Sequence, residues 1–212
     1  MSGPTFTDLT GLAGVALALG ATVLALPGVR RLTRPRRGAL LGAVVILALI
    51  PIGTLPVAAA VRGVFGDLSI TTLVLLGSAM LRGLTGWPPV NDRARVALLG
   101  FVAVAALALY PMALGVGFFD PYRSGYGSPW LVGGLLAVAL AAWFGRLELA
   151  ATCLALATLA WTLRWYESTN LWDYLLDPLV AGYALGSLAV RGMKRALGAF
   201  RGTAPGEIAA PR

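Results

Sequence analysis

Apolar runs recur along the whole chain, and short polar segments separate them. Each run approaches the roughly 20 residues that an α-helix needs to cross a bilayer. They predict helices over residues 10–28, 38–61, 68–84, 96–117, 130–144 and 149–163, and a last helix that begins between 170 and 178 and ends near 190. The sequence therefore predicts an all-α, polytopic membrane bundle of about seven transmembrane helices. We expect a single domain over residues 1–200 and a disordered cytoplasmic tail over residues 201–212.

Prolines and capping residues predict the details of these helices. Pro51 and Pro56 each remove a backbone donor, so we expect the second helix to be kinked. Asp67 is well placed to cap the third helix. Ser128 and Pro129 are typical of an N-cap followed by the first helical residue.

The fifth and sixth runs are short. Each holds 15 residues, a helix of about 22 Å, whereas the hydrocarbon layer is about 30 Å thick. Either both runs cross the bilayer as thin spans, or they form a re-entrant hairpin that turns at residues 145–148. We favour two thin spans, because Arg146 at a turn inside the hydrocarbon would be costly.

The basic residues predict how the chain threads the membrane. With seven spans and the N-terminus outside, all of the 17 lysines and arginines except Arg62, Arg123 and Arg164 fall on the cytoplasmic side. Basic residues concentrate in cytoplasmic loops, so this orientation is favoured and the C-terminus is cytoplasmic. Six carboxylates then lie outside: Asp8, Asp67, Asp120, Glu167, Asp173 and Asp177.

Composition excludes several classes of function. The net charge is +8, but the arginines lie between apolar runs and form no nucleic-acid surface. The chain has no histidine and a single cysteine, Cys153, in mid-helix. We therefore expect no metal site, no haem ligation and no cofactor. The bilayer is the expected partner, together with another membrane protein or a second copy of the chain. The preference for arginine over lysine suggests a GC-rich bacterium, so the predicted location is the inner membrane, as a multi-pass protein.

The stretch over residues 161–178 carries the predicted functional site. It gathers acidic and aromatic side chains at the outer boundary of the bundle. The candidate acids are Asp173, Asp177, Glu167 and Asp120, and the candidate partners for them are Arg164 and Arg123. The aromatic side chains Trp161, Trp165 and Trp172 are typical of an interfacial belt, with a stacking platform for a sugar or lipid headgroup as the alternative.

Two interpretations of Asp177 are weighed equally. Asp173 and Asp177 are four residues apart and would share the face of one helix. Asp177 would then be an acid embedded in the membrane, serving a proton, a cation or a cationic headgroup. Alternatively, Asp177 caps a helix whose first residue is Pro178.

Three functional classes follow. The favoured one is a non-enzymatic accessory or partner-binding subunit of a cell-envelope or membrane complex, because no nucleophile and base pair is recognisable. The second is a small proton- or cation-coupled transporter that uses Asp173 or Asp177. The third is an outer-face enzyme that acts on a lipid or lipid-linked sugar, with carboxylates as general acid or base.

Overall fold

The computed structural model describes residues 5–116 and 119–202, and helices make up most of them. The α-helices are α1 (Phe6–Ala25), α2 (Arg34–Leu49), α3 (Val57–Phe65), α4 (Ile70–Thr85), α5 (Asp92–Ala113), α6 (Pro129–Phe144), α7 (Glu148–Thr162), α8 (Leu171–Leu175) and α9 (Pro178–Gly202). Two 3-10 helices, η1 (Val29–Arg31) and η2 (Pro121–Gly125), and two short strands, β1 (Pro51–Ile52) and β2 (Leu55–Pro56), complete the described part. The all-helical fold class is confirmed. The helix α9 enters the segment predicted as a tail, of which residues 203–212 lie outside the described residues.

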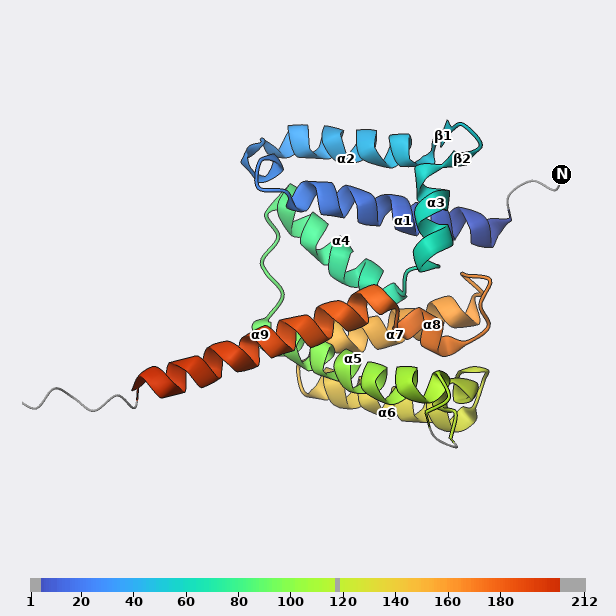
Figure 1. The fold of residues 1–212 in the computed structure, drawn as a ribbon, viewed down its shortest axis with the longest axis vertical. Coiled ribbons are helices and arrows are strands. Elements are labelled where there is room, and N and C mark those ends of the chain that lie inside the picture. The colour runs from blue at the N-terminus through green and yellow to red at the C-terminus, as the bar shows by residue number, and fades with distance from the viewer. Residues whose placement is uncertain (1–4, 117–118, 203–212) are drawn as a thin grey trace, which may run out of the picture.

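The long helices run back and forth between two ends of the molecule (Figure 1). One end, here the arginine end, holds η1, the α4–α5 loop, the α6–α7 turn and the C-terminal part of α9. The other, here the hairpin end, holds the β1–β2 hairpin, η2 and α8. Within the described residues, α1 and α5 are long and apolar enough to cross a membrane, and α4, α6 and α7 are apolar but shorter. Length and composition of the helices thus do not confirm seven spans.

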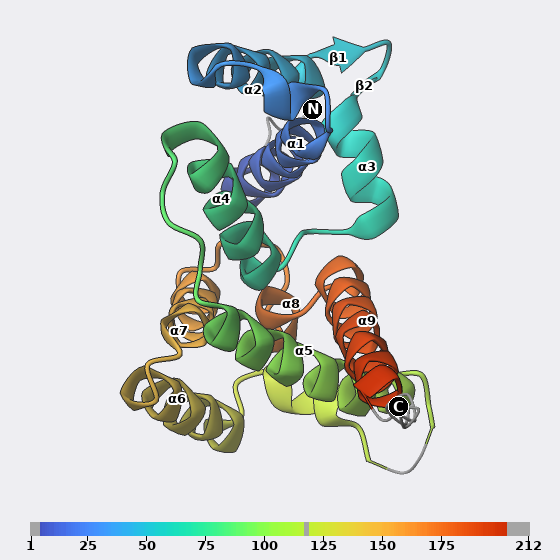
Figure 2. The ribbon, with the colours of Figure 1, turned by 90° about the vertical axis from the view of Figure 1, so that its left-hand side faces the viewer.

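The helices form two lobes (Figure 2). The N-terminal lobe, α1–α4, packs around a small core that includes Val15, Ala16 and Ala58. The C-terminal lobe, α5–α9, has a larger core, which includes Leu99 and Tyr174. The helix α4 joins the lobes, because its first half packs against the core of the second lobe.

The second predicted helix is not kinked but interrupted, so that prediction is wrong. The helix α2 ends at Leu49, a hairpin follows in which Pro51 pairs with Pro56, and α3 begins afterwards. The residue before a proline avoids helical dihedral angles, and Ile50 is extended. Gly53, at φ +81°, supplies the left-handed conformation that the turn requires.

Other local predictions are corrected or supported. Ser69, not Asp67, is the N-cap of α4. Pro129 is the first residue of α6, as predicted, and Ser128 precedes it without a side-chain capping bond. The helices α6 and α7 form an antiparallel pair whose turn lies at the arginine end, beside the start of α5 (Figure 1).

Candidate functional site

Asp177 caps α9. Its Oδ1 accepts a hydrogen bond from the backbone N–H of Val180 at 2.8 Å, and Pro178 is the first helical residue. The capping interpretation of Asp177 is therefore correct. Asp177 is nevertheless only 4% exposed, so this cap lies inside the protein.

The second oxygen of Asp177 binds the N-terminus of α4. Oδ2 accepts from the Ser69 N–H and the Ser69 hydroxyl, both at 2.8 Å, and from the Thr72 hydroxyl at 2.5 Å. One carboxylate therefore caps a helix from each lobe, and the positive ends of both helix dipoles stabilise its charge. We call Asp177, Ser69, Thr72 and Val180 the Asp177 clasp.

A cavity of about 270 Å³ lies beside the clasp at the hairpin end. We call it the outer cavity. Its polar lining comes from both lobes and from the segment between α7 and α9: Asp67, Tyr110, Tyr166, Ser168, Asp173 and Asp177. The sequence predicted two of these carboxylates, Asp173 and Asp177, as site residues.

Asp173 reaches the cavity from α8, a separate helix from the one that Asp177 caps. The chain is extended at Leu176, so the prediction that Asp173 and Asp177 share one helix face is wrong. Asp173 accepts hydrogen bonds from the hydroxyls of Tyr122, at 3.0 Å, and Ser168. Burial, followed by the neighbouring charge of Asp173, raises the pKa of Tyr122 above its usual value.

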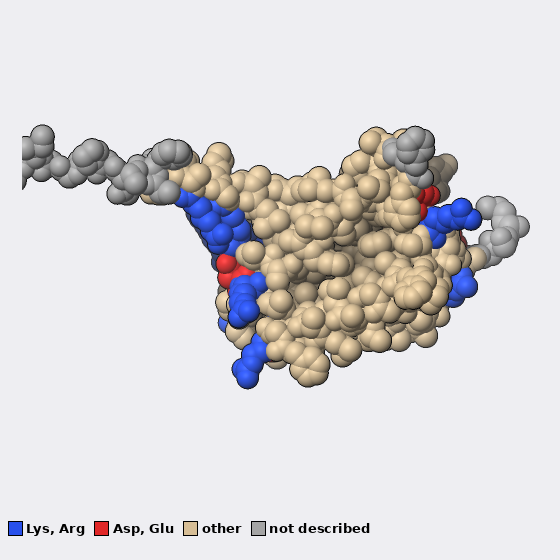
Figure 3. Space-filling model, turned by 90° about the horizontal axis from the view of Figure 1, so that it is seen from below, with Lys and Arg blue, Asp and Glu red and all other residues tan. Residues whose placement is uncertain are grey.

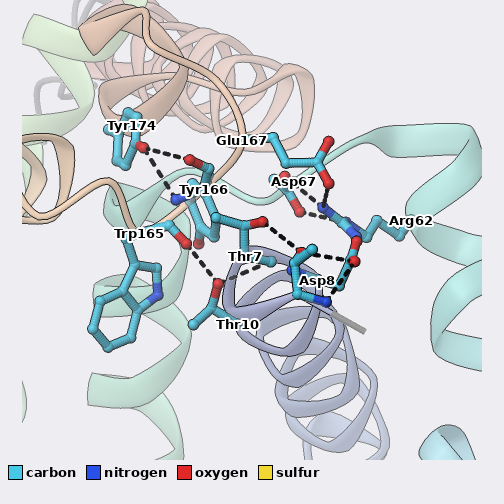
Figure 4. Close-up of polar contacts among 10 residues, drawn as sticks. Thr7, Asp8, Thr10, Arg62, Asp67, Trp165, Tyr166, Glu167 and Tyr174 are labelled. Carbon is cyan, nitrogen blue, oxygen red and sulfur yellow. Dashed lines mark hydrogen bonds and ion pairs between the residues drawn. The ribbon is translucent and has the colours of Figure 1, made fainter. Parts of the chain in front are cut away.

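Arg62 connects the carboxylates of the N-terminal lobe (Figure 4). Its guanidinium donates to Asp67 at 2.6 and 3.1 Å and to Asp8 at 3.0 Å, and lies 3.8 Å from Glu167. The hydrogen bond to Asp67 raises the pKa of Arg62. The charge of Asp67 is therefore paired with that of Arg62. Glu167, with a side chain 63% exposed, lies at the edge of this network of ion pairs around Arg62. The predictions missed this role of Arg62.

Two tyrosine hydroxyls in the outer cavity have no hydrogen-bond partner among the described residues: Tyr110 and Tyr166. Tyr166 is only 2% exposed, and burial raises the pKa of its phenol. Its backbone, by contrast, is held by the hydroxyl of Tyr174 (Figure 4), which accepts from the Tyr166 N–H at 3.1 Å. A buried hydroxyl without a partner is uncommon in proteins and indicates a position for a ligand or an ordered water.

The remaining predicted polar residues lie outside the cavity. Asp120 is exposed and caps η2 through the N–H of Tyr122 at 3.0 Å. Arg123 and Arg164 are exposed and form no ion pair with a carboxylate in the part of the chain that the structure describes. Of the four candidate acids, Glu167 is the one that lies near an arginine in the described part of the chain, and that arginine is Arg62.

The tryptophans hold loops in place. The indole N–H of Trp161 donates to the carbonyl of Thr169 at 2.8 Å, and that of Trp172 donates to the carbonyl of Pro121 at 3.1 Å. Trp165 packs edge-on against Phe6, with ring centroids 5.6 Å apart. The three side chains thus contact separate parts of the hairpin end.

The charge of the outer cavity is acidic. Three carboxylates line it, Asp67, Asp173 and Asp177, and no arginine or lysine stands among its described lining residues. Arg62, outside the lining, binds Asp67, whereas Asp173 and Asp177 accept hydrogen bonds from uncharged donors. No group of three His, Cys, Asp or Glu side chains among residues 5–116 and 119–202 is arranged to hold a metal ion. An organic cation with N–H donors matches the open acceptors, namely the hydroxyl oxygens of Tyr110 and Tyr166.

Comparison of the chain with protein-family models, with curated proteins and with solved structures found no match.

Proposed function

We propose that the protein is a multi-pass protein of a bacterial inner membrane, with the hairpin end on the non-cytoplasmic side. The lengths of α1 and α5 support a membrane location. Figure 3 adds that charged side chains gather at the two ends of one face, with a wide uncharged band between them, as a bilayer requires. The back-and-forth path of α1, α2, α4, α5, α6, α7 and α9 supports seven crossings. The concentration of arginine at the arginine end supports the orientation.

The function that the geometry supports best is non-enzymatic binding of a primary ammonium group at the outer cavity, as an accessory subunit of an envelope complex. The observation that carries this proposal is the unpartnered, buried hydroxyl of Tyr166 in a cavity with more carboxylates than guanidinium groups. Catalysis is less well supported, because the protein already saturates Asp177 and donates to Asp173, which leaves neither free as a general base. The ammonium group would belong to a small amine or to an ethanolamine headgroup of the outer leaflet.

Calorimetric titration of the purified protein in neutral detergent tests the proposal. We expect ethanolamine to bind saturably and choline to bind at least about tenfold more weakly, because choline carries the same charge without N–H donors. Tyr166→Phe and Asp173→Asn should weaken ethanolamine binding by a similar factor. The matched control is Asp120→Asn, which changes an exposed carboxylate outside the cavity and should bind ethanolamine normally. Equal affinity for choline, or an equal loss in Asp120→Asn, would contradict the proposal.

A second candidate, coupled transport of a proton or cation, is favoured by one observation. Thr72 and Val180 of the Asp177 clasp also line a larger groove of about 880 Å³ between the lobes. We call it the inner groove. The clasp therefore lies between the outer cavity and the inner groove, where a gate would be needed. Uptake of ethanolamine into proteoliposomes that is lost in Asp173→Asn and kept in Asp120→Asn would favour transport. Binding without flux would leave the accessory role.

A further inference from the structure

The inner groove has an apolar interior and a cationic mouth. Leu75, Leu76 and Ala79 of α4 line one wall, and Leu149, Leu179 and Val180 of the C-terminal lobe line the other. Three arginines also line the groove: Arg30, Arg82 and Arg95. They come from η1, the last turn of α4 and the first turn of α5, which all lie at the arginine end.

The positive charge at this mouth is not balanced. The one carboxylate that lines the groove, Asp92, is bound in a bidentate pair by Arg191, with N–O distances of 2.8 and 2.6 Å. Within the described residues, Arg30, Arg82 and Arg95 form no ion pair. Arg95 instead contacts Tyr183, whose hydroxyl accepts its hydrogen bond and whose ring lies 5.7 Å from the guanidinium carbon.

The dimensions of the groove fit an amphiphile better than a small anion. From Thr72 to Arg82 the groove follows α4 over about 15 Å, given the rise of an α-helix. Its volume of about 880 Å³ is near the upper end of ordinary ligand sites. A free anion would use only the mouth and leave the apolar interior exposed, whereas a lipid satisfies both parts.

We propose that the inner groove binds one anionic phospholipid of the cytoplasmic leaflet, with the phosphate at Arg30, Arg82 and Arg95 and an acyl chain between the lobes. Arginine recognises phosphate through parallel N–H donors, and basic pockets between helices on the cytoplasmic side suit anionic headgroups. An acyl chain between α4 and α9 would fill the space between the lobes up to the Asp177 clasp. The proposal rests on the membrane location given above and is independent of the outer cavity.

Native mass spectrometry of the detergent-purified protein with added dioleoylphosphatidylglycerol tests this site. We expect one tightly bound phosphatidylglycerol per protein, and at least about tenfold weaker binding of phosphatidylcholine with the same chains. Arg82→Gln should weaken phosphatidylglycerol binding about tenfold, and Arg82→Lys should weaken it less. Ala79→Trp, which fills the groove without changing charge, should abolish the tight site.

The control variant is Arg36→Gln, which removes an arginine of the same end that does not line the groove. It should bind phosphatidylglycerol as the unchanged protein does. Unaltered binding in Ala79→Trp, or an equal loss in Arg36→Gln, would overturn the proposal in favour of general attraction to a basic surface. Inorganic phosphate that competes fully with the lipid would overturn it in favour of a free-anion site. Melting temperatures without lipid separate loss of binding from loss of folding for every variant.

Discussion

The hydroxyl of Thr72 on α4 donates to the carboxylate of Asp177, 105 residues further along the chain, at 2.5 Å. This hydrogen bond crosses the boundary between the two lobes. Together with the two bonds from Ser69 it fixes the start of α4 against the start of α9. Because the carboxylate is buried, each donor depends on it for satisfaction.

Asp177→Asn should therefore destabilise the fold. An amide has one acceptor oxygen, so it can face either the donors of α4 or the N–H of Val180, and its NH2 group meets donors on the other side. We expect the free energy of unfolding to fall by about 2–4 kcal/mol. Denaturant unfolding in detergent micelles, followed by tryptophan fluorescence, measures the change. Asp120→Asn is the control, since asparagine caps as well as aspartate and the site is exposed. Equal stability of the two variants would contradict the role of the clasp.

Two glycines of α1 should respond differently to the same substitution. A Cβ at Gly11 would lie 2.2 Å from Asp67 Oδ1 and 2.6 Å from Arg62 Nε, whereas at Gly14 its nearest neighbour would be a Leu73 methyl at 3.5 Å. Gly11→Ala should thus break the Arg62–Asp67 pair and destabilise the protein by about 1–3 kcal/mol. Gly14→Ala should be neutral or stabilise slightly, because alanine favours the helix. The same unfolding measurement distinguishes them, and matching losses would argue against a tight approach at Gly11.

Most helices were predictable because apolar runs and charged loops alternate along this chain. The predicted start at Pro129 and the turn at residues 145–148 agree with α6 and α7. The interruption after Leu49 was not predicted. Two prolines indicate a break or a kink equally well, and the pairing of Pro51 with Pro56 depends on the left-handed conformation of Gly53.

Of the candidate site, only the acidic residues could be predicted from the sequence. Asp173 and Asp177 stood out by type and spacing, but the interaction of Arg62 with Asp8 joins residues 54 apart and depends on how α1 packs against α3. One signal was present in the sequence. The carboxylates predicted to lie outside outnumber the arginines predicted there two to one, which favours an arginine that serves several carboxylates without requiring it. Which arginine does so follows from tertiary packing alone.

The buried tyrosines predict a loss of stability at alkaline pH. Burial raises the pKa values of Tyr122, Tyr166 and Tyr174 above the ordinary value of 10. A folded-state pKa above the unfolded one gives stability that is fully present below pH 10 and declines as pH rises beyond it. Phenolate absorbance should therefore appear late for these tyrosines, together with unfolding. Tyr166→Phe should reduce the decline above pH 10 and leave stability at neutral pH within about 1 kcal/mol. An unchanged alkaline transition would contradict the buried state of Tyr166.

The orientation in the membrane can be tested with single cysteines. Cys153, the one native cysteine, is 1% exposed, so the unchanged protein should give no background labelling. Glu167→Cys places a thiol at an exposed position of the hairpin end, and Arg36→Cys places one at the arginine end. Since basic residues mark the cytoplasmic side, a membrane-impermeant maleimide should label Glu167→Cys in intact cells and Arg36→Cys only in inverted vesicles. The opposite pattern would place the outer cavity in the cytoplasm and remove the basis for an extracytoplasmic ligand. Labelling of both introduced cysteines from the same side would exclude an odd number of membrane crossings between residues 36 and 167.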